Sequence, residues 1–174
     1  IQIIEESSEP EEFLENTKLE MYNDQVFCFT PKGNLIILPK GANAIDFSYA
    51  VHSEIGNSAV GAKINNKNRL MTTEIQNGDQ VEILTSKSGF PDPKWMETCI
   101  TGKAKSAIKR YIRNREIREF HQLGTALLQK EYRQQNKRMH EKSLIRVINK
   151  FGLLDLEELL IQIGKGNIKS REVV

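Results

Sequence analysis

The stretch FTPKGNLIILPKGANAIDFSYAVHSEIG, from Phe29 to Gly56, decides the fold of the first half of the chain. The run QVFCFT, which leads into it, and the run NLIILP within it are rich in β-favouring residues. Pro31 and Gly33 stand between these runs, where proline presets a turn dihedral and glycine accepts a positive φ. The pattern predicts a β-hairpin.

A helix is predicted directly after the hairpin. Asn43 is a favourable N-cap residue, and Asp46 follows at the third helical position, where a carboxylate interacts with the first-turn amides. The spacing predicts a helix over 44–55 that carries Tyr49 and His52, with Gly56 as the residue that ends it.

More strands are predicted after this helix. AVGAKIN favours a strand, NNKN a turn and RLM a short extended piece. Asn77-Gly78 is a strong turn dipeptide, and a further strand is predicted over 81–84. The order of two strands, one helix and then more strands predicts an α+β, ubiquitin-like β-grasp domain with the helix on one face of the sheet.

The pattern changes to helical periodicity after the linker-like SKSGFPDP. Gly102 is predicted to interrupt the helical pattern, and the long periodic stretch that follows from Lys103 is predicted to break or turn near Asn114, because Ile117 leaves its apolar face. Two short helices are predicted next, one capped by Gly152 and one that begins at Asp155 and ends at Gly164. We therefore predict an acidic linker over 1–21, a β-grasp domain over 22–86 and a small all-α domain over 87–174.

Composition narrows the class of protein. Of 174 residues, 39% are hydrophobic and 28% charged, as in a globular chain with polar helix surfaces. No apolar run is long enough for a membrane span and no secretory signal is visible, so we expect a cytoplasmic protein with no membrane partner. Residues 1–20 carry seven Glu and one Lys, which leaves the remainder basic.

Neither catalytic nor metal-binding motifs stand out. The chain has no G-x-S-x-G, phosphate-binding loop or H-E-x-x-H sequence. Cys28 and Cys99 lie far apart and lack the paired spacing of zinc ligands, and Cys28 is expected to be buried. His121 and His140 are isolated and are expected to be surface or half-buried residues. We expect no catalytic residue, metal or cofactor in this segment.

A basic cluster offers a binding surface. On a helix, Lys105, Lys109 and Arg113 form one i, i+4 row, with Lys103 and Arg110 on the next. Such a row can follow a phosphate backbone, although a solvated helix face explains the same composition. His52 leaves a similar choice open: it packs on the helix, or together with Tyr49 it contacts a partner such as an exposed base.

These residues resemble a known family. The run from DQVFCFTPKGNLIILPKG through DFSYAVHSEIG to IQNGDQVEILTSK, over about residues 24–86, is similar to the TGS domain, a β-grasp module of threonyl-tRNA synthetases, certain GTPases and SpoT. PDPKWMETCITGKAKSAIKRYIR resembles the segment that follows this domain in long RelA/SpoT homologues, and EEFLENTKLEMYN resembles the linker before it.

The resemblance implies a parent enzyme that makes and hydrolyses guanosine tetra- and pentaphosphate, with its catalytic domains outside this chain. It implies that the histidine of a D-F-x-Y-x-x-H-x-x-x-G run touches the free 3′ end of deacylated tRNA on the ribosome, a role that falls to His52. In SpoT-type members the implied partner is acyl carrier protein. A stand-alone enzyme, a structural spacer and a TGS domain of another RNA-binding protein are the alternatives.

Overall fold

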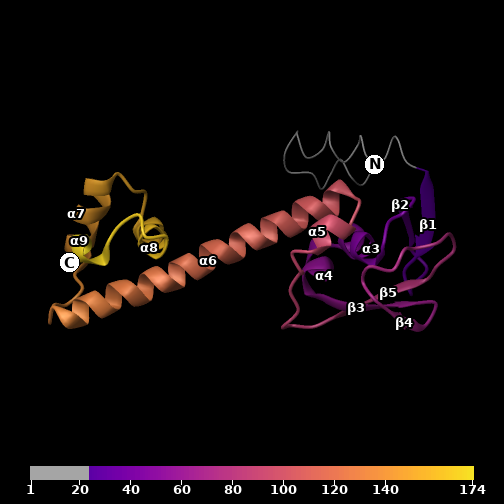
Figure 1. The fold of residues 1–174 in the computed structure, drawn as a ribbon, viewed down its shortest axis with the longest axis horizontal. Helices are drawn as coiled ribbons and strands as arrows, with labels where there is room; N and C mark the ends of the chain where they lie inside the picture. The colour runs from indigo at the N-terminus through magenta and orange to yellow at the C-terminus, as the bar shows by residue number, and fades with distance from the viewer. Residues whose placement is uncertain (1–23) are drawn as a thin grey trace. The chain divides into compact units, whose positions relative to one another are not determined.

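The computed structural model describes residues 24–174, and the predicted acidic linker lies outside them. By backbone contacts the chain divides into two units that meet between residues 112 and 113. The first contains the strands β1 (Gln25–Phe29), β2 (Leu35–Pro39), β3 (Ala59–Ile64), β4 (Lys67–Arg69) and β5 (Val81–Thr85), with α3 (Ala44–Val51), α4 (Ser53–Ser58) and α5 (Trp95–Thr98) (Figure 1). The fold class is the predicted one, a β-grasp domain followed by helices.

The predicted hairpin forms with β1 antiparallel to β2, and Gly33 has a φ of +86° in the turn. β3 pairs antiparallel with both β4 and β5. A parallel bridge between Phe29 and Gln80 then joins β1 to the start of β5, supported by a hydrogen bond of 2.9 Å from Phe29 N to Asp79 O. The order along the sheet is therefore β2-β1-β5-β3-β4, and α3 covers its inner face.

The hairpin has one buried and one exposed apolar face. Cys28, between the two phenylalanines of β1, is fully buried, as predicted. On the other face Phe27 pairs with Ile37 and Phe29 with Leu35, and all four remain more than one-third exposed. Such cross-strand pairs stabilise a hairpin even without further cover.

Helix α6 (Gly102–Gln134) runs without interruption from the first unit into the second, so the predicted break near Asn114 is wrong. Ala104 and Ile108 are buried in the first core, whereas Leu128 and Tyr132 are buried in a second one. The face formed by Leu128 and Tyr132 differs from that formed by Ala104 and Ile108 by about a third of a turn around the helix. The apolar pattern shifts because the two ends of α6 pack in two different cores. Such a shift does not require a break in the helix.

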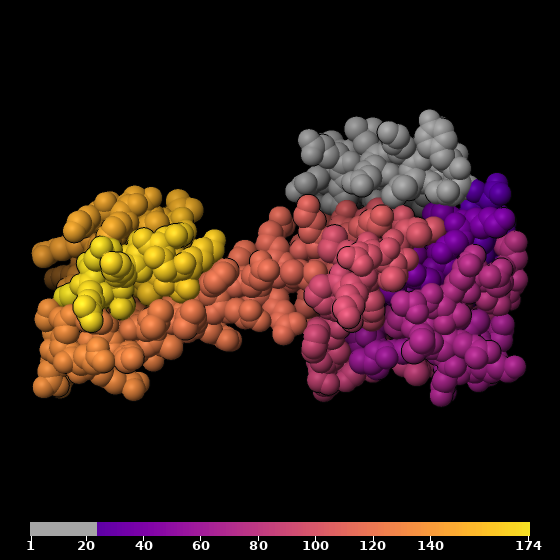
Figure 2. Space-filling view, viewed as in Figure 1, coloured from indigo at the N-terminus to yellow at the C-terminus, as the bar shows by residue number. Residues whose placement is uncertain are grey.

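Residues 95–112 pack on the first unit. Cys99, Ala104, Ala107 and Ile108 belong to the same buried cluster as the β-grasp residues. In Figure 2 the pink atoms of this segment lie beside the purple atoms of the β-grasp residues. The sequence pattern assigned this segment to the helical domain because its periodicity is helical, but its apolar face completes the core of the β-grasp unit.

The second unit combines the end of α6 with α7 (Glu141–Phe151), α8 (Leu156–Gly164) and α9 (Ser170–Val173). Gly152 ends α7 with a φ of +66°, and the Asp155 carboxylate begins α8 by accepting from Glu158 N at 2.8 Å. Both features, and the end of α8 at Gly164, confirm the sequence prediction. Within residues 24–174 no helix combines the length and apolar character that a membrane span requires.

Candidate partner-binding site

Helix α3 begins as predicted. The Asn43 side-chain oxygen accepts hydrogen bonds from the backbone N–H groups of Ile45 and Asp46, at 3.0 and 3.2 Å. In return the Asp46 carboxylate accepts from Asn43 N at 3.1 Å, which completes a capping box. These hydrogen bonds fix the residue at which α3 begins.

The end of α3 differs from the prediction. His52 has an extended backbone, with φ −167° and ψ 146°, so the helix stops at Val51 and Gly56 lies inside the separate short helix α4. The predicted helix over 44–55, with Gly56 as the C′ residue directly after it, is therefore wrong. The physical reason is that His52 caps both helices: its N–H donates to Ser48 O at 3.2 Å, and its ring begins α4.

The hydrogen bond accepted by the His52 ring determines which ring nitrogen can donate to a partner. The backbone N–H of Glu54 donates to His52 Nδ1 at 3.1 Å, so Nδ1 is an acceptor and the proton of the neutral ring lies on Nε2. Among the residues that the structure describes, none hydrogen-bonds to Nε2. His52 is exposed, and its free Nε2–H can donate to an acceptor outside the chain.

Tyr49 lies beneath this turn instead of on the surface. Its side chain is 0% exposed, and its hydroxyl donates to Asn57 Oδ1 at 2.9 Å. Its ring is packed so closely on Gly56 that a Cβ there would lie 2.4 Å from Tyr49 Cδ1. Burial leaves Tyr49 no accessible surface for a direct partner contact, so we assign it the role of supporting the turn that presents His52.

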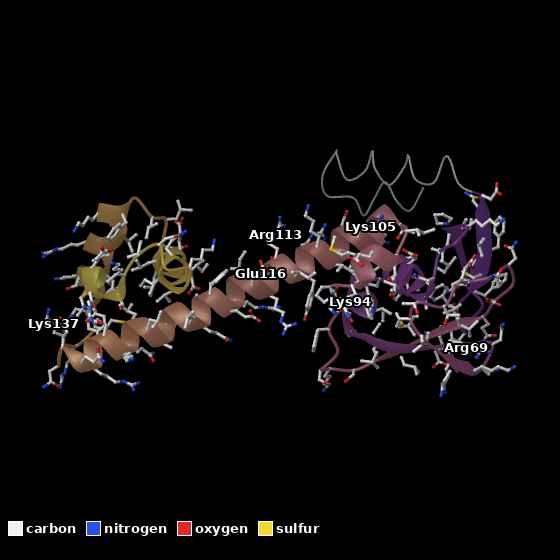
Figure 3. All side chains as sticks on the ribbon, viewed as in Figure 1. Arg69, Lys94, Lys105, Arg113, Glu116 and Lys137 are labelled. Carbon is white, nitrogen blue, oxygen red and sulfur yellow. The ribbon has the colours of Figure 1, made fainter. Side chains whose placement is uncertain are left out.

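The basic row occupies one side of α6 near its start. Lys109 and Arg113 are exposed and Lys105 is half-buried, and their i, i+4 spacing puts them on the flank away from Ala104 and Ile108. Figure 3 shows Lys105 and Arg113 along this helix. The continuous helix therefore confirms the geometry of the row, whereas its binding role stays a prediction.

The two remaining basic residues of the predicted site differ from this row. Arg110 is exposed and Lys103 is half-buried. Both already interact with other parts of the chain, so neither is an unpartnered cation.

Comparison with known proteins identifies both parts of the chain. The family model described as TGS domain matches residues 26–85, and the model described as RelA/SpoT AH domain matches residues 111–174. The chain is a TGS–AH segment of the RelA/SpoT family. The AH match begins next to the point where the second unit begins.

Curated relatives align along the chain. It is 43% identical over all 174 residues to the GTP pyrophosphokinase rsh of Brucella ovis, of which it covers 23%. It is 34% identical to the GTP pyrophosphokinase of Myxococcus xanthus over 95% of this chain and 22% of that protein. It is 33% identical over its full length to a guanosine-3′,5′-bis(diphosphate) 3′-pyrophosphohydrolase of Aquifex aeolicus, of which it covers 25%. The chain thus spans about a quarter of the length of these relatives.

Both cysteines of the chain are buried in the first unit. Cys28 is 0% and Cys99 2% exposed. Burial raises the pKa of Cys28 to about 12 and that of Cys99 to about 11, with nearby carboxylates adding to both shifts. Both cysteines therefore stay protonated near neutral pH and serve as core residues. Within residues 24–174 no three His, Cys, Asp or Glu side chains gather in a way that could hold a metal ion.

The other histidines belong to the AH domain. His121 Nε2 lies 2.6 Å from Glu157 Oε2 and so links α6 to α8, a role that the sequence did not indicate. His140 is exposed at the start of α7 and makes no side-chain cap.

Proposed function

We propose that this TGS–AH segment is a regulatory part of a guanosine tetra- and pentaphosphate synthetase and hydrolase. In this proposal the TGS domain recognises the free 3′ end of deacylated tRNA on the cytoplasmic ribosome, and the catalytic domains of the same polypeptide respond. The observation that carries the proposal is the exposed His52 ring, whose Nδ1 is occupied by Glu54 N and whose Nε2–H is free to donate.

The surroundings of His52 support a contact role. At the five fixed positions of the run that resembles the family motif, Asp46, Phe47, Tyr49 and Gly56 are buried, and His52 is exposed. A single-stranded 3′ end offers unstacked bases and free hydroxyls, which an imidazole can stack on or hydrogen-bond. An aminoacyl group on the terminal ribose would enlarge the ligand at this point, so close contact would distinguish charged from uncharged tRNA.

The basic row supplies the second part of the interface. Each phosphate that Lys105, Lys109 or Arg113 contacts releases a counterion, which strengthens binding without reading sequence. A nucleic acid anchored by its end at His52 would gain affinity from such a row.

Acyl carrier protein is the second candidate partner. An acidic protein would match the charge of the same row on α6, but it gives the exposed imidazole no specific task. A spacer without a ligand would need neither feature. Regulation would follow if the ligand binds one state of the parent better than the other, since a ligand shifts a conformational equilibrium only by its difference in affinity.

The test is to measure binding of the full chain to deacylated tRNA, aminoacylated tRNA and acyl carrier protein at two salt concentrations. Three forms are compared: wild type, His52→Ala and His52→Asn. Asparagine is a good N-cap, so His52→Asn keeps an acceptor for Glu54 N while it removes the imidazole. Urea unfolding of each variant shows whether the cap survives.

The proposal predicts that the wild type prefers deacylated tRNA and that both variants lose this preference. It also predicts that His52→Asn keeps wild-type stability. Binding of deacylated and aminoacylated tRNA with equal affinity would refute charge sensing. Binding of acyl carrier protein alone, unaffected by either variant, would replace tRNA by that partner and leave His52 as a helix cap.

A further inference from the structure

Asp46 is a buried carboxylate that connects two helices. Its side chain is 1% exposed, and no basic residue within 24–174 forms an ion pair with it. Besides Asn43 N, it accepts hydrogen bonds from Ile100 N at 3.1 Å, Thr101 N at 3.0 Å and Thr101 Oγ1 at 2.9 Å. A buried charge without a counterion is costly unless several donors satisfy it, and here backbone amides and a hydroxyl do so.

These donors belong to the start of α6. Thr101 precedes the first residue of the helix, and its Oγ1 accepts from Ala104 N at 3.2 Å, as an N-cap does. The Asp46 carboxylate thus lies at the N-termini of both α3 and α6, where the helix dipoles favour a negative charge. A second link runs beside it, because Asn43 Nδ2 donates to Thr98 O at 2.9 Å.

The two helices that meet at Asp46 carry the two parts of the proposed interface. His52 stands at the far end of α3, and the row of Lys105 and Lys109 begins one turn into α6. Ile45 and Phe47 of α3 share one buried cluster with Ala104 and Ile108 of α6. Apolar contacts of this kind hold the helices together but tolerate small shifts along the interface, whereas the hydrogen bonds to Asp46 fix where α6 starts.

We propose that Asp46 is a positioning residue for partner recognition: through Thr101 it sets the register of the α6 basic row relative to His52, so that one nucleic-acid strand engages both. This inference rests on the proposed function. A ligand bound at two linked points gains affinity only if their geometry permits simultaneous contact. Loss of the register would therefore weaken ligands that span both points and spare ligands that reach His52 alone.

The test uses Thr101, because substitution of Asp46 itself threatens folding. Thr101→Val is nearly isosteric but removes the hydroxyl that donates to Asp46 and caps α6, whereas Thr101→Ser retains it. The probes are the trinucleotide CCA, which carries only two internucleotide phosphates, and an RNA minihelix that ends in single-stranded CCA, which adds the many phosphates of its stem. Binding to the full chain is followed by NMR titration for the first probe and by fluorescence anisotropy at several salt concentrations for the second.

We expect Thr101→Val to weaken minihelix binding on the order of tenfold and to reduce its salt dependence, as the loss of phosphate contacts requires. The affinity for CCA should stay unchanged, and Thr101→Ser should behave as wild type. A double-mutant cycle completes the test: in a Lys105→Ala, Lys109→Ala background, Thr101→Val should have no further effect on minihelix binding, because it acts through that row.

Equal losses for both probes, or additive losses in the cycle, would mean that the Asp46–Thr101 contact serves stability alone, and this inference would be wrong. Unchanged minihelix binding by Thr101→Val would also overturn it. A wild type that binds neither probe would instead refute the proposed function.

Discussion

The crossing of α6 and α8 in the AH domain yields a quantitative prediction. Gly124 on α6 and Gly164 on α8 bring the two backbones into contact: a Cβ on Gly124 would lie 1.7 Å from Leu160 O, and one on Gly164 would lie 1.9 Å from Phe120 O. We consider Gly124→Ala. An ordinary carbon contact needs about 3.5 Å, so the backbone of α8 would have to retreat by well over 1 Å.

Two terms of opposite sign decide the outcome. Alanine is better than glycine in a helix by about 1 kcal/mol. Overpacking costs about 1–3 kcal/mol, and the upper end applies here because the obstacle is a main-chain carbonyl of another helix. The net loss should be about 2 kcal/mol, which corresponds to roughly 8–16 °C in the melting temperature of a unit of this size.

The assay is urea unfolding followed by two signals. Far-UV circular dichroism reports the helices of both units, whereas fluorescence of Trp95, the single tryptophan, reports the first unit, which contains the TGS domain. Gly124→Ala should lower the urea midpoint at which the AH domain unfolds, as seen by circular dichroism. The urea midpoint of the fluorescence transition should stay unchanged. The matched control compares Gln122→Ala with Gln122→Gly at an exposed site two residues away, where alanine should be the more stable by about 1 kcal/mol. If Gly124→Ala stabilised the protein as the exposed site does, the described contact of α6 with α8 would be refuted.

Three further substitutions test other parts of the structure. Gly56→Ala places a Cβ against the buried Tyr49 ring, and urea unfolding followed by tryptophan fluorescence should show a loss of about 1–3 kcal/mol. Because burial raises the pKa of Cys99 to about 11, its stabilising contribution is complete below about pH 9 and is lost as the pH rises. As the pH rises above about 9, the unfolding free energy should fall less in Cys99→Ala than in the wild type, by up to about 3 kcal/mol. Asp155→Ala removes the acceptor for Glu158 N at the start of α8 and should cost about 1 kcal/mol in the AH transition, whereas Asp155→Ser should restore most of it.

Each of these has a clear contrary result. Unchanged stability in Gly56→Ala would mean that the ring of Tyr49 can move, and the turn at His52 would then be less fixed than described. Parallel alkaline profiles for wild type and Cys99→Ala would show that this thiol is accessible. Equal stability of the Ala and Ser variants at position 155 would deny the side-chain cap.

Much of the fold could be predicted from the sequence, because it depends on interactions between residues that are close together in the chain. The hairpin, the N-cap at Asn43 and the left-handed Gly152 depend on residues a few positions apart, and turn and cap preferences describe such contacts well. The continuous α6 could not be predicted in this way. Its apolar face changes side because the helix packs against two cores, and periodicity within one window cannot distinguish that from a break.

The candidate site shows the same limit. The sequence placed Asp46 at the third position of a helix, which is correct, but its bonds to Ile100 and Thr101 join residues more than 50 positions apart. The residues next to Asp46 in the sequence give no sign that its hydrogen-bond donors are Ile100 and Thr101. Their three-residue spacing on a predicted helix places Tyr49 and His52 on one face, yet the Tyr49 ring packs inward on Gly56, and His52 lies beyond the end of the helix.

The interruption of the helix at His52 is therefore the feature that matters most for the proposed function. In a continuous helix over 44–55 the amide of Glu54 would donate to a backbone carbonyl, and the ring at position 52 would have no fixed tautomer. Because the backbone is extended at His52, that amide donates to Nδ1 instead, which orients the ring and leaves the proton on Nε2. A ring held in this way loses little freedom on binding, which is the physical advantage of a preorganised contact.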